Sequence, residues 1–325
     1  SAVKLLLMDG EGSIKNIVSK EYPLEFPRPG WSQQNPEDWR RAVLEGVPEL
    51  LRGFDAGQVA GIGAGGQMHG LVVLDKDGNV IRPAILWNDG RTAKEVDYLN
   101  GVVGREKLSR LTANIAFAGF TAPKILWIKN NRPEIYAKAA KFLTGSSYLC
   151  AKLTGEYTID QYLAEDFLPL YDLKHRAVDT EHCTLFCRPD QLAQVRSATD
   201  IAGRVTARAA AETGLCAGTP VLVGTGDSGA EAVSTGVFQP GDIMVQLGSS
   251  CFFVYLTDRL VDENRLWPGT FIIPDVYSIC AGTNTAGTLT KWFRDQIYGD
   301  LAAAEAAGGE NACLPGLLLC LPGRL

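Results

Sequence analysis

The chain has 325 residues, of which 46% are apolar and 21% are charged, and its formal net charge at pH 7 is −6. A chain of this length is too long for one ordinary hydrophobic core and suits about two domains. Its composition excludes a disordered protein. Its negative charge argues against a nucleic-acid partner, because surfaces that neutralise phosphates are usually basic.

The sequence also lacks the signals of a membrane or secreted protein. No apolar run reaches the ~18 residues that a membrane span needs. The first residues do not show the basic, apolar and small-residue regions of a signal peptide. We therefore expect a cytoplasmic protein with no membrane partner.

The eight cysteines are too few to cross-link a chain of this length, so we expect free thiols in the interior. Four of them stand in apolar surroundings, namely Cys150, Cys251, Cys280 and Cys320. His182, Cys183 and Cys187 are three potential metal ligands. A zinc site needs a fourth ligand, and none follows at a suitable spacing, so metal binding is the less favoured interpretation.

The first part of the sequence predicts a hairpin followed by a helix. Residues 3–9 and 14–26 read as two strands that a glycine-rich turn joins. Asn35, Pro36 and Glu37 form a helix start, with a capping amide, a proline in the first position and an acid near the positive end of the dipole. Pro48 predicts that this helix kinks or restarts.

Further strands and helices are expected along the rest of the chain. Residues 58–63 predict a short strand, and Asp77-Gly78 between two apolar runs is a strong hairpin signal. Helices are expected at residues 92–100, 121–130, 133–142, 146–153 and 228–237, and strands at 220–224, 243–247 and 252–256. Such a mixture favours an α/β or α+β protein. We place the domain boundary at the turn of residues 239–242, which gives domains 1–238 and 239–325.

One acid stands where a predicted strand gives way to a predicted helix. In Gly224-Thr225-Gly226-Asp227, the glycines let the backbone approach a ligand closely, and Asp227 precedes a helix N-terminus. A carboxylate there can accept a proton from an alcohol that attacks phosphorus. The alternative is that Asp227 only caps the helix.

Two more glycine-bounded loops are candidates for binding. Gly248, Ser249 and Ser250 join two strands and present N–H groups and hydroxyls together, which suits an anion, although Gly-Ser-Ser occurs in many ordinary loops. Met68 and His69 stand between Gly66 and Gly70. A lone histidine is more often structural than catalytic.

The segment from Trp87 to Arg91 groups an aromatic ring with an amide, an acid and a guanidinium. Sugar hydroxyl groups favour such a mixture, so Trp87 and Asn88 are candidate sugar contacts. Asp89 could equally cap the helix expected near Thr92.

Four stretches resemble the FGGY family of carbohydrate kinases, within the sugar kinase, actin and Hsp70 superfamily. Residues 119–131 follow the family signature, with a hydroxyl residue, Lys124 and Trp127 in order. The other stretches are residues 29–39, residues 66–70 with 83–91, and residues 224–227 leading into 246–250. The third of the four resembles the xylulose kinases in particular.

The resemblance implies an α/β protein of the actin-like, ribonuclease H-like ATPase fold, with two lobes that close over a sugar, ATP and Mg²⁺. It makes Asp227 the catalytic base that deprotonates the sugar hydroxyl. Met68, His69 and Trp87 match sugar contacts. Lys4 matches the lysine of the first phosphate hairpin, and residues 248–250 match the second phosphate loop. The resemblance identifies no metal ligand among residues 1–325.

Three features depart from the family pattern. The Asp-x-Gly-Thr strand that opens the family is absent before Ser1, and no Gly-Glu-Arg-x-Pro segment follows the apolar residues 317–322. We therefore expect either a shortened chain or part of a longer polypeptide. Ser228 stands where xylulose kinases usually carry Asn or Gln, which leaves the sugar open.

The leading hypothesis is an ATP-dependent kinase that converts D-xylulose to D-xylulose 5-phosphate. A kinase for ribulose, glycerol or another polyol is an alternative within the class, and a non-catalytic sugar-binding module is an alternative outside it. A nicotinamide-dependent oxidoreductase is disfavoured, because no Gly-x-Gly-x-x-Gly follows the first strand. The oligomeric state is open, with a homodimer as one option.

Overall fold

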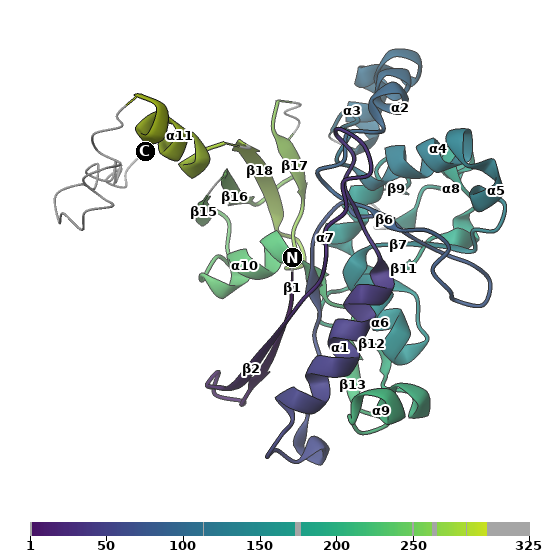
Figure 1. The fold of residues 1–325 in the computed structure, drawn as a ribbon. Coiled ribbons are helices and arrows are strands. Elements are labelled where there is room, and N and C mark those ends of the chain that lie inside the picture. Colours follow the sequence, from purple (N-terminus) through teal and green to yellow (C-terminus); the bar gives the residue numbers. More distant parts are fainter. Residues whose placement is uncertain are drawn as a thin grey trace. The chain divides into compact units, whose positions relative to one another are not determined.

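The computed structural model of the chain describes residues 2–112, 114–172, 177–248, 250–261, 265–283 and 285–297 (Figure 1). The strands are β1 (Ala2–Met8), β2 (Ile14–Glu21), β3 (Gln33–Gln34), β4 (Gly65–Gly66), β5 (Val72–Leu74), β6 (Ala84–Ile85), β7 (Lys141–Leu143), β8 (Thr158–Asp160), β9 (Tyr171–Asp172), β10 (Ala177–Val178), β11 (Gln194–Arg196), β12 (Ile201–Arg204), β13 (Pro220–Leu222), β14 (Thr225–Gly226), β15 (Ile243–Leu247), β16 (Cys251–Thr257), β17 (Trp267–Thr270) and β18 (Tyr277–Thr283).

The helices are α1 (Pro36–Leu50), α2 (Ala93–Tyr98), α3 (Arg105–Thr112), α4 (Thr121–Asn131), α5 (Pro133–Tyr136), α6 (Gly145–Thr154), α7 (Gln161–Ala164), α8 (Thr180–Phe186), α9 (Ala207–Thr213), α10 (Asp227–Ser234) and α11 (Gly287–Ile297). Shorter turns of 3-10 type are η1 (Ala56–Gln58), η3 (Glu165–Phe167) and η4 (Pro189–Gln191), and η2 (Leu99–Gly104) is a π-helical turn. None of the helices in the described part of the chain is long and apolar enough to cross a membrane.

The chain forms two compact units. The first comprises residues 1–243 and 254–280, and the second comprises residues 244–253 and 281–325. The first unit holds the residues around Asp227 and His69, whereas the second holds the described residues of the loop 248–250. The division at residues 238 and 239 stays a prediction.

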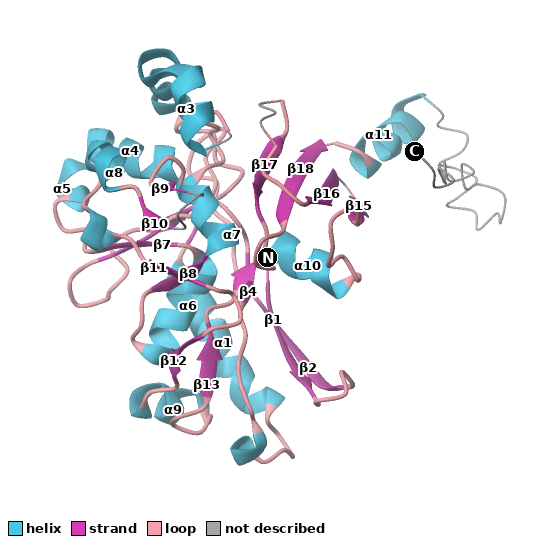
Figure 2. Ribbon diagram, turned by 180° about the vertical axis from the view of Figure 1, so that it is seen from behind, coloured by secondary structure: helices cyan, strands magenta, loops and turns pink. Residues whose placement is uncertain are grey.

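The main hydrophobic core of the first unit surrounds the antiparallel pair of β5 and β7. Val72 and Val73 of β5 and Phe142 of β7 are completely buried, together with apolar side chains of α4, α6 and α8. Figure 2 shows the backbone of β7 and of these three helices. Burying one such side chain stabilises a fold by about 1.5–3 kcal/mol. This core supports α4, whose side chains reach the candidate site described below.

The predicted hairpin and the helix after it are confirmed. Strands β1 and β2 pair in antiparallel fashion, with Leu5 opposite Val18. Asn35 caps α1 by accepting a hydrogen bond from the backbone N–H of Glu37. Pro48 does not restart the helix, because α1 continues through it to Leu50, and the alternative of a kink at Pro48 stays a prediction. Proline this close to the end of a helix removes only one of its last hydrogen bonds.

Other predicted elements are confirmed in part. The Asp77-Gly78 turn forms, with Gly78 at φ +77°. The helix expected at residues 146–153 is α6, and Gly155 ends it in the left-handed region at φ +81°. The helix expected at residues 133–142 is too long, because α5 ends at Tyr136 and residues 141–143 form β7 instead. Pairing with β5 in the core overrides the local helical preference there.

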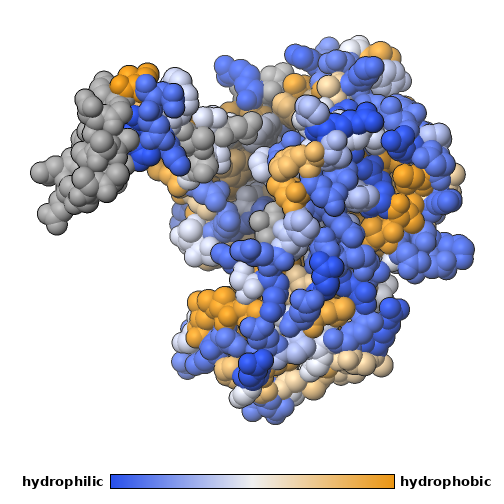
Figure 3. Space-filling model, viewed as in Figure 1, coloured by the Kyte–Doolittle hydropathy of each residue, from blue (hydrophilic) through white to orange (hydrophobic). Residues whose placement is uncertain are grey.

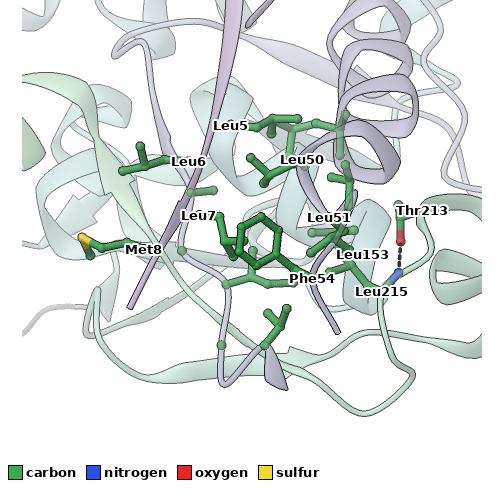
Figure 4. A pocket seen from close by; sticks show the side chains of 18 of the residues that line it. Leu5, Leu6, Leu7, Met8, Leu50, Leu51, Phe54, Leu153, Thr213 and Leu215 are labelled. Carbon is green, nitrogen blue, oxygen red and sulfur yellow. Dashed lines mark hydrogen bonds between the residues drawn. The ribbon is translucent and has the colours of Figure 1, made fainter. Parts of the chain in front are cut away.

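The strand expected at residues 58–63 does not form. This segment follows η1, and its Ile62 makes only an isolated parallel bridge to Val221 of β13. With β1 and α1, the segment lines a groove of about 970 Å³ in the first unit. Leu5 and Leu7 of β1 point into this groove, on the same side as Leu50 and Phe54 (Figure 4).

The opposite face of the hairpin is apolar and exposed. Leu6 and Met8 of β1 are 50% and 55% exposed, and Ile14 and Ile17 of β2 are each 56% exposed. A hydrophobic area appears at the lower left of the space-filling view, where Figure 1 places the hairpin of β1 and β2 (Figure 3). Strand side chains alternate in direction, so Leu5 and Leu7 point into the groove, while Leu6 and Met8, which also border it, are half exposed on the other face.

Candidate active site

Two short parallel strands position the candidate site. Strand β14 pairs with β4, with Thr225 opposite Gly65 and Gly226 opposite Gly66. Parallel strands end at the same edge, so the residues that follow each strand become neighbours. The loop of Met68 and His69 follows β4, and α10 with Asp227 follows β14.

Direct contacts confirm that the two segments touch. The hydroxyl of Ser228 donates to Sδ of Met68 at 3.0 Å, and it lies 2.9 Å from the hydroxyl of the buried Tyr162. The structure thus brings together three of the residues singled out in the sequence, namely Met68, His69 and Asp227, with Ser228 between the first and the last.

Asp227 is the first residue of α10, and Gly226 is the residue that precedes the helix. The interpretation of Asp227 as a cap is therefore wrong, since the capping position belongs to a glycine with no side chain. The carboxylate accepts a hydrogen bond only from the adjacent N–H of Ser228, at 2.9 Å, among the contacts of the described residues. The remaining oxygen is available to a ligand.

The surroundings of Asp227 favour a base over a fully ionised surface acid. The residue is exposed, yet enough neighbouring atoms surround its carboxyl group to disfavour the ionised form. This burial raises the pKa of Asp227 above its ordinary value, and the negative charges of Glu231 and Asp166 raise it further. A carboxylate with a raised pKa binds a proton more strongly, which makes it a better general base.

His69 adopts a left-handed backbone conformation, with φ at +61°. Its backbone N–H donates to Oδ2 of Asp166 at 2.6 Å, and its carbonyl accepts from Nζ of Lys124 at 2.5 Å. Its ring nitrogen Nδ1 lies 2.7 Å from Oδ1 of Asp166, although the geometry of this contact does not meet that of a hydrogen bond. The ring also packs against Phe120, with centroids 5.2 Å apart.

Asp166 and Lys124 are functional candidates that the sequence did not assign. Both side chains are almost fully buried, at 1% and 0% exposed. Burial lowers the pKa of Lys124 to about 7, although the charges of Asp166 and Asp89 act in the opposite direction. Lys124 had a signal, since it stands in the signature stretch 119–131, but Asp166 carries none.

Trp87 and Asn88 follow β6 and are both exposed, Trp87 by 50%. An exposed aromatic ring suits a contact with a sugar. The interpretation of Asp89 as a helix cap is wrong. Its carboxylate is buried and accepts from the backbone of Ser32 at 2.6 Å and from the guanidinium of Arg91 at 2.7 Å, so it holds the loop together.

The predicted phosphate contacts lie elsewhere in the chain. Lys4 is exposed on β1 and is among the residues that line the groove. Gly248 belongs to the second unit, where its N–H donates to the carbonyl of Ser250 at 2.9 Å. Ser249 and the apolar residues 317–322 lie outside the described residues. The roles of Lys4, Gly248, Ser249 and Ser250 stay predictions.

The described residues form no closed metal site, since no three His, Cys, Asp or Glu side chains among them gather to hold an ion. Mg²⁺ seldom needs such a cage, because it keeps several waters and takes one or two carboxylates together with substrate phosphates. The unpaired oxygen of Asp227 fits a single contact of that kind.

The cysteines are free in the described part of the chain. Cys150 and Cys280 are buried as expected, whereas Cys251 is only half-buried and Cys320 lies outside the described residues. Cys183 and Cys187 lie with their sulfur atoms 3.6 Å apart.

Comparison with known proteins shows the family to which the chain is similar. Residues 1–234 match the N-terminal domain of the FGGY family of carbohydrate kinases. Xylulose kinase of Escherichia coli strain K12 is 34% identical over 294 residues, which cover 90% of this chain and 60% of that protein. Xylulose kinase of Staphylococcus xylosus is 30% identical over 303 residues, 92% of this chain and 62% of that protein. A glycerol kinase of Thermococcus kodakarensis is 28% identical over 308 residues, 91% of this chain and 61% of that protein.

The crystal structure of xylulose kinase from Rhodospirillum rubrum has a TM-score of 0.89 with this chain at 25% identity, and it covers 94% of this chain and 63% of that one. The predicted actin-like, ribonuclease H-like fold is thereby confirmed. The chain spans about three fifths of the length of the curated relatives it matches. Since the family match extends over residues 1–234 and includes both strands that position Asp227, this chain belongs to the FGGY family of carbohydrate kinases.

Proposed function

We propose that the protein transfers the γ-phosphoryl group of ATP to the terminal hydroxyl of a ketopentose, D-xylulose in the first place, and releases ADP and D-xylulose 5-phosphate. The observation that carries this proposal is the carboxylate of Asp227 beside the loop of Met68 and His69, on the adjoining ends of two parallel strands. The names of the relatives support the sugar.

In the proposed reaction, Asp227 takes the proton of the sugar hydroxyl group as the oxygen of that hydroxyl attacks the γ-phosphorus. The bond from that phosphorus to the bridging oxygen breaks, and ADP leaves with the electron pair. Mg²⁺ bound with the nucleotide neutralises the charge of the phosphates. Met68, His69, Trp87 and Asn88 hold the sugar, while Lys4, Gly248, Ser249 and Ser250 contact the phosphates.

The arrangement suits a kinase because Asp227 is exposed to solvent and its carboxylate has a raised pKa. The burial that raises the pKa of Asp227 brings it closer to neutral pH, where a general base works best. Contacts with Asp166 fix the orientation of the backbone N–H and of the ring of the neighbouring His69. A cytoplasmic location would supply the ATP.

The test is ADP release by the purified full-length protein with D-xylulose, ATP and Mg²⁺. We expect release that depends on the sugar, and we expect Asp227→Ala to lower it by about 10²–10⁴-fold, the usual contribution of a general base. The variant must keep the circular dichroism and unfolding temperature of the wild type. Sugar-independent release, or a variant as active as the wild type, contradicts the proposal.

A kinase for another polyol is the second candidate, because a glycerol kinase is among the relatives and Ser228 departs from the xylulose kinase pattern. A panel of D-xylulose, D-ribulose and glycerol separates these substrates by kcat/KM. Calorimetry on the chain of 325 residues alone then addresses a non-catalytic sugar-binding module, which would bind D-xylulose but not ATP.

A further inference from the structure

The peptide group of His69 is held from both sides by buried charges. Asp166 accepts its N–H at 2.6 Å, and Lys124 donates to its carbonyl at 2.5 Å. Residues with a Cβ atom seldom adopt the left-handed conformation that His69 has, with φ at +61°. The two charged groups therefore stabilise a backbone conformation that the local sequence does not prefer.

Lys124 connects two separate loops through one ammonium group. Besides the carbonyl of His69, its Nζ donates to the carbonyl of Gly119, in the loop that leads into α4. Gly119 lies against the main chain of Trp87, since a Cβ atom on Gly119 would come 3.2 Å from the carbonyl oxygen of Trp87. The lysine thus ties the His69 loop to the segment that carries the exposed Trp87.

A buried ammonium is an expensive way to join two loops. Removing a charge from water disfavours folding unless close partners compensate, and a neutral side chain often serves stability as well. Here the burial is complete, and Asp166, the acid whose charge acts most strongly on Lys124, is itself engaged by the N–H and the ring of His69. Stability alone does not account for this arrangement.

We propose that Lys124 and Asp166 are positioning residues, which hold His69 in its left-handed conformation and thereby fix the Met68–His69 loop and Trp87 as one rigid sugar-binding surface beside Asp227. This inference rests on the proposed function. Neither residue touches the sugar. The expected effect of losing either one is therefore weaker sugar recognition and not loss of nucleotide binding.

Lys129 offers a matched control on the same helix. Its ammonium also donates to a backbone carbonyl, that of Leu185 at 2.7 Å, but this carbonyl belongs to α8 and not to the site. The substitutions Lys124→Met and Lys129→Met each remove from α4 one ammonium group that donates to backbone carbonyls of other segments. Asp166→Asn is a second, smaller change that keeps an oxygen for the N–H of His69 and removes the charge.

The first measurement is steady-state kinetics of the full-length protein. We expect Lys124→Met and Asp166→Asn to raise the KM for the sugar about tenfold or more, because small misplacements of binding groups have effects of this size. The KM for ATP should change by less than about twofold. Lys129→Met should leave both values unchanged. Equal sugar KM values in wild type, Lys124→Met and Asp166→Asn overturn the proposal, as does an equal rise in Lys129→Met.

The second measurement does not depend on catalysis. The chain has three histidines, so a protein labelled with ¹⁵N-histidine gives few ring signals, and His69→Gln assigns the one of interest. We expect Lys124→Met and Asp166→Asn to shift this signal and Lys129→Met to leave it in place. An unmoved signal overturns the proposal even where Lys124→Met folds poorly, because Asp166→Asn is nearly isosteric. A protein without kinase activity that still shows these shifts refutes the proposed function but keeps the positioning role.

Discussion

Gly226 leaves no room for a side chain on the face that meets Met68. A Cβ atom on Gly226 would come 2.8 Å from Cγ of Met68 and 3.2 Å from Cδ2 of Leu163. The glycine therefore sets how closely strand β14 approaches the loop after β4. This approach is what places Asp227, the next residue, beside Met68 and His69.

We expect Gly226→Ala to displace Met68 and to destabilise the fold by about 1–3 kcal/mol, the usual effect of overpacking a filled site. The KM for the sugar should rise as the loop moves. Gly65→Ala on the neighbouring strand is the control, because its Cβ atom would meet only the Cβ of Ala230 at 3.8 Å, an ordinary contact. Thermal unfolding and kinetics check both variants, and a control as damaging as Gly226→Ala would refute the explanation.

The pH dependence of catalysis should report Asp227. A base acts only when it is ionised, so kcat/KM should fall as pH falls through its pKa, which lies above the ordinary 3.8. Glu231 raises this pKa through its negative charge and is exposed. We therefore expect Glu231→Gln to move the acid limb of the kcat/KM profile to lower pH without changing the plateau. A limb that stays in place means that another group controls it.

Trp87 should contribute to sugar binding and little to stability. Half of its side chain is exposed, so Trp87→Ala removes few packing contacts and should change the unfolding temperature only slightly. We expect the KM for the sugar to rise severalfold with the KM for ATP unchanged. Trp87→Phe keeps an aromatic face and should recover most of the loss. A rise in the ATP KM alone would place this ring at the nucleotide instead.

Much of the local structure was predictable because its signals are local. Asn35 and Pro36 mark the start of α1, and Gly78 and Gly155 occupy left-handed positions that a glycine favours. The prediction of a helix through Phe142 failed for a nonlocal reason, since that residue is buried in the core by pairing with β5. Propensity does not contain this information.

The candidate site was predictable only where glycines and motif residues surround it. The contacts that hold it span long distances in sequence: 97 residues separate His69 from Asp166, and 55 separate it from Lys124. The pairing of β4 with β14 involves two residues on each strand, three of them glycines. Such strands have no side-chain pattern that a sequence could reveal.

A last prediction concerns Asp160, which is fully buried beneath the site and accepts from the hydroxyl of Thr225 at 2.6 Å. Burial raises the pKa of Asp160 from 3.8 to about 7. Between these values the folded protein keeps a proton that the unfolded chain releases, so the free energy of unfolding should fall as pH rises from about 4 to about 7.

Asp160→Asn removes this titration and should flatten the pH dependence, leaving the variant relatively more stable at pH 8 than at pH 4. The difference can reach the order of 4 kcal/mol, at about 1.4 kcal/mol for each unit of pKa shift. Any hydrogen bond lost to Thr225 lowers stability equally at all pH values and leaves the slope unaffected. Asp75→Asn is the control, because hydrogen bonds from Asn79 lower the pKa of Asp75 below 3.8, so its contribution is lost only below the measured range and the slope between pH 4 and 8 should stay that of the wild type. Urea unfolding of the three proteins from pH 4 to 8 decides the matter: parallel curves for wild type and Asp160→Asn would mean that Asp160 is ionised in the folded protein throughout.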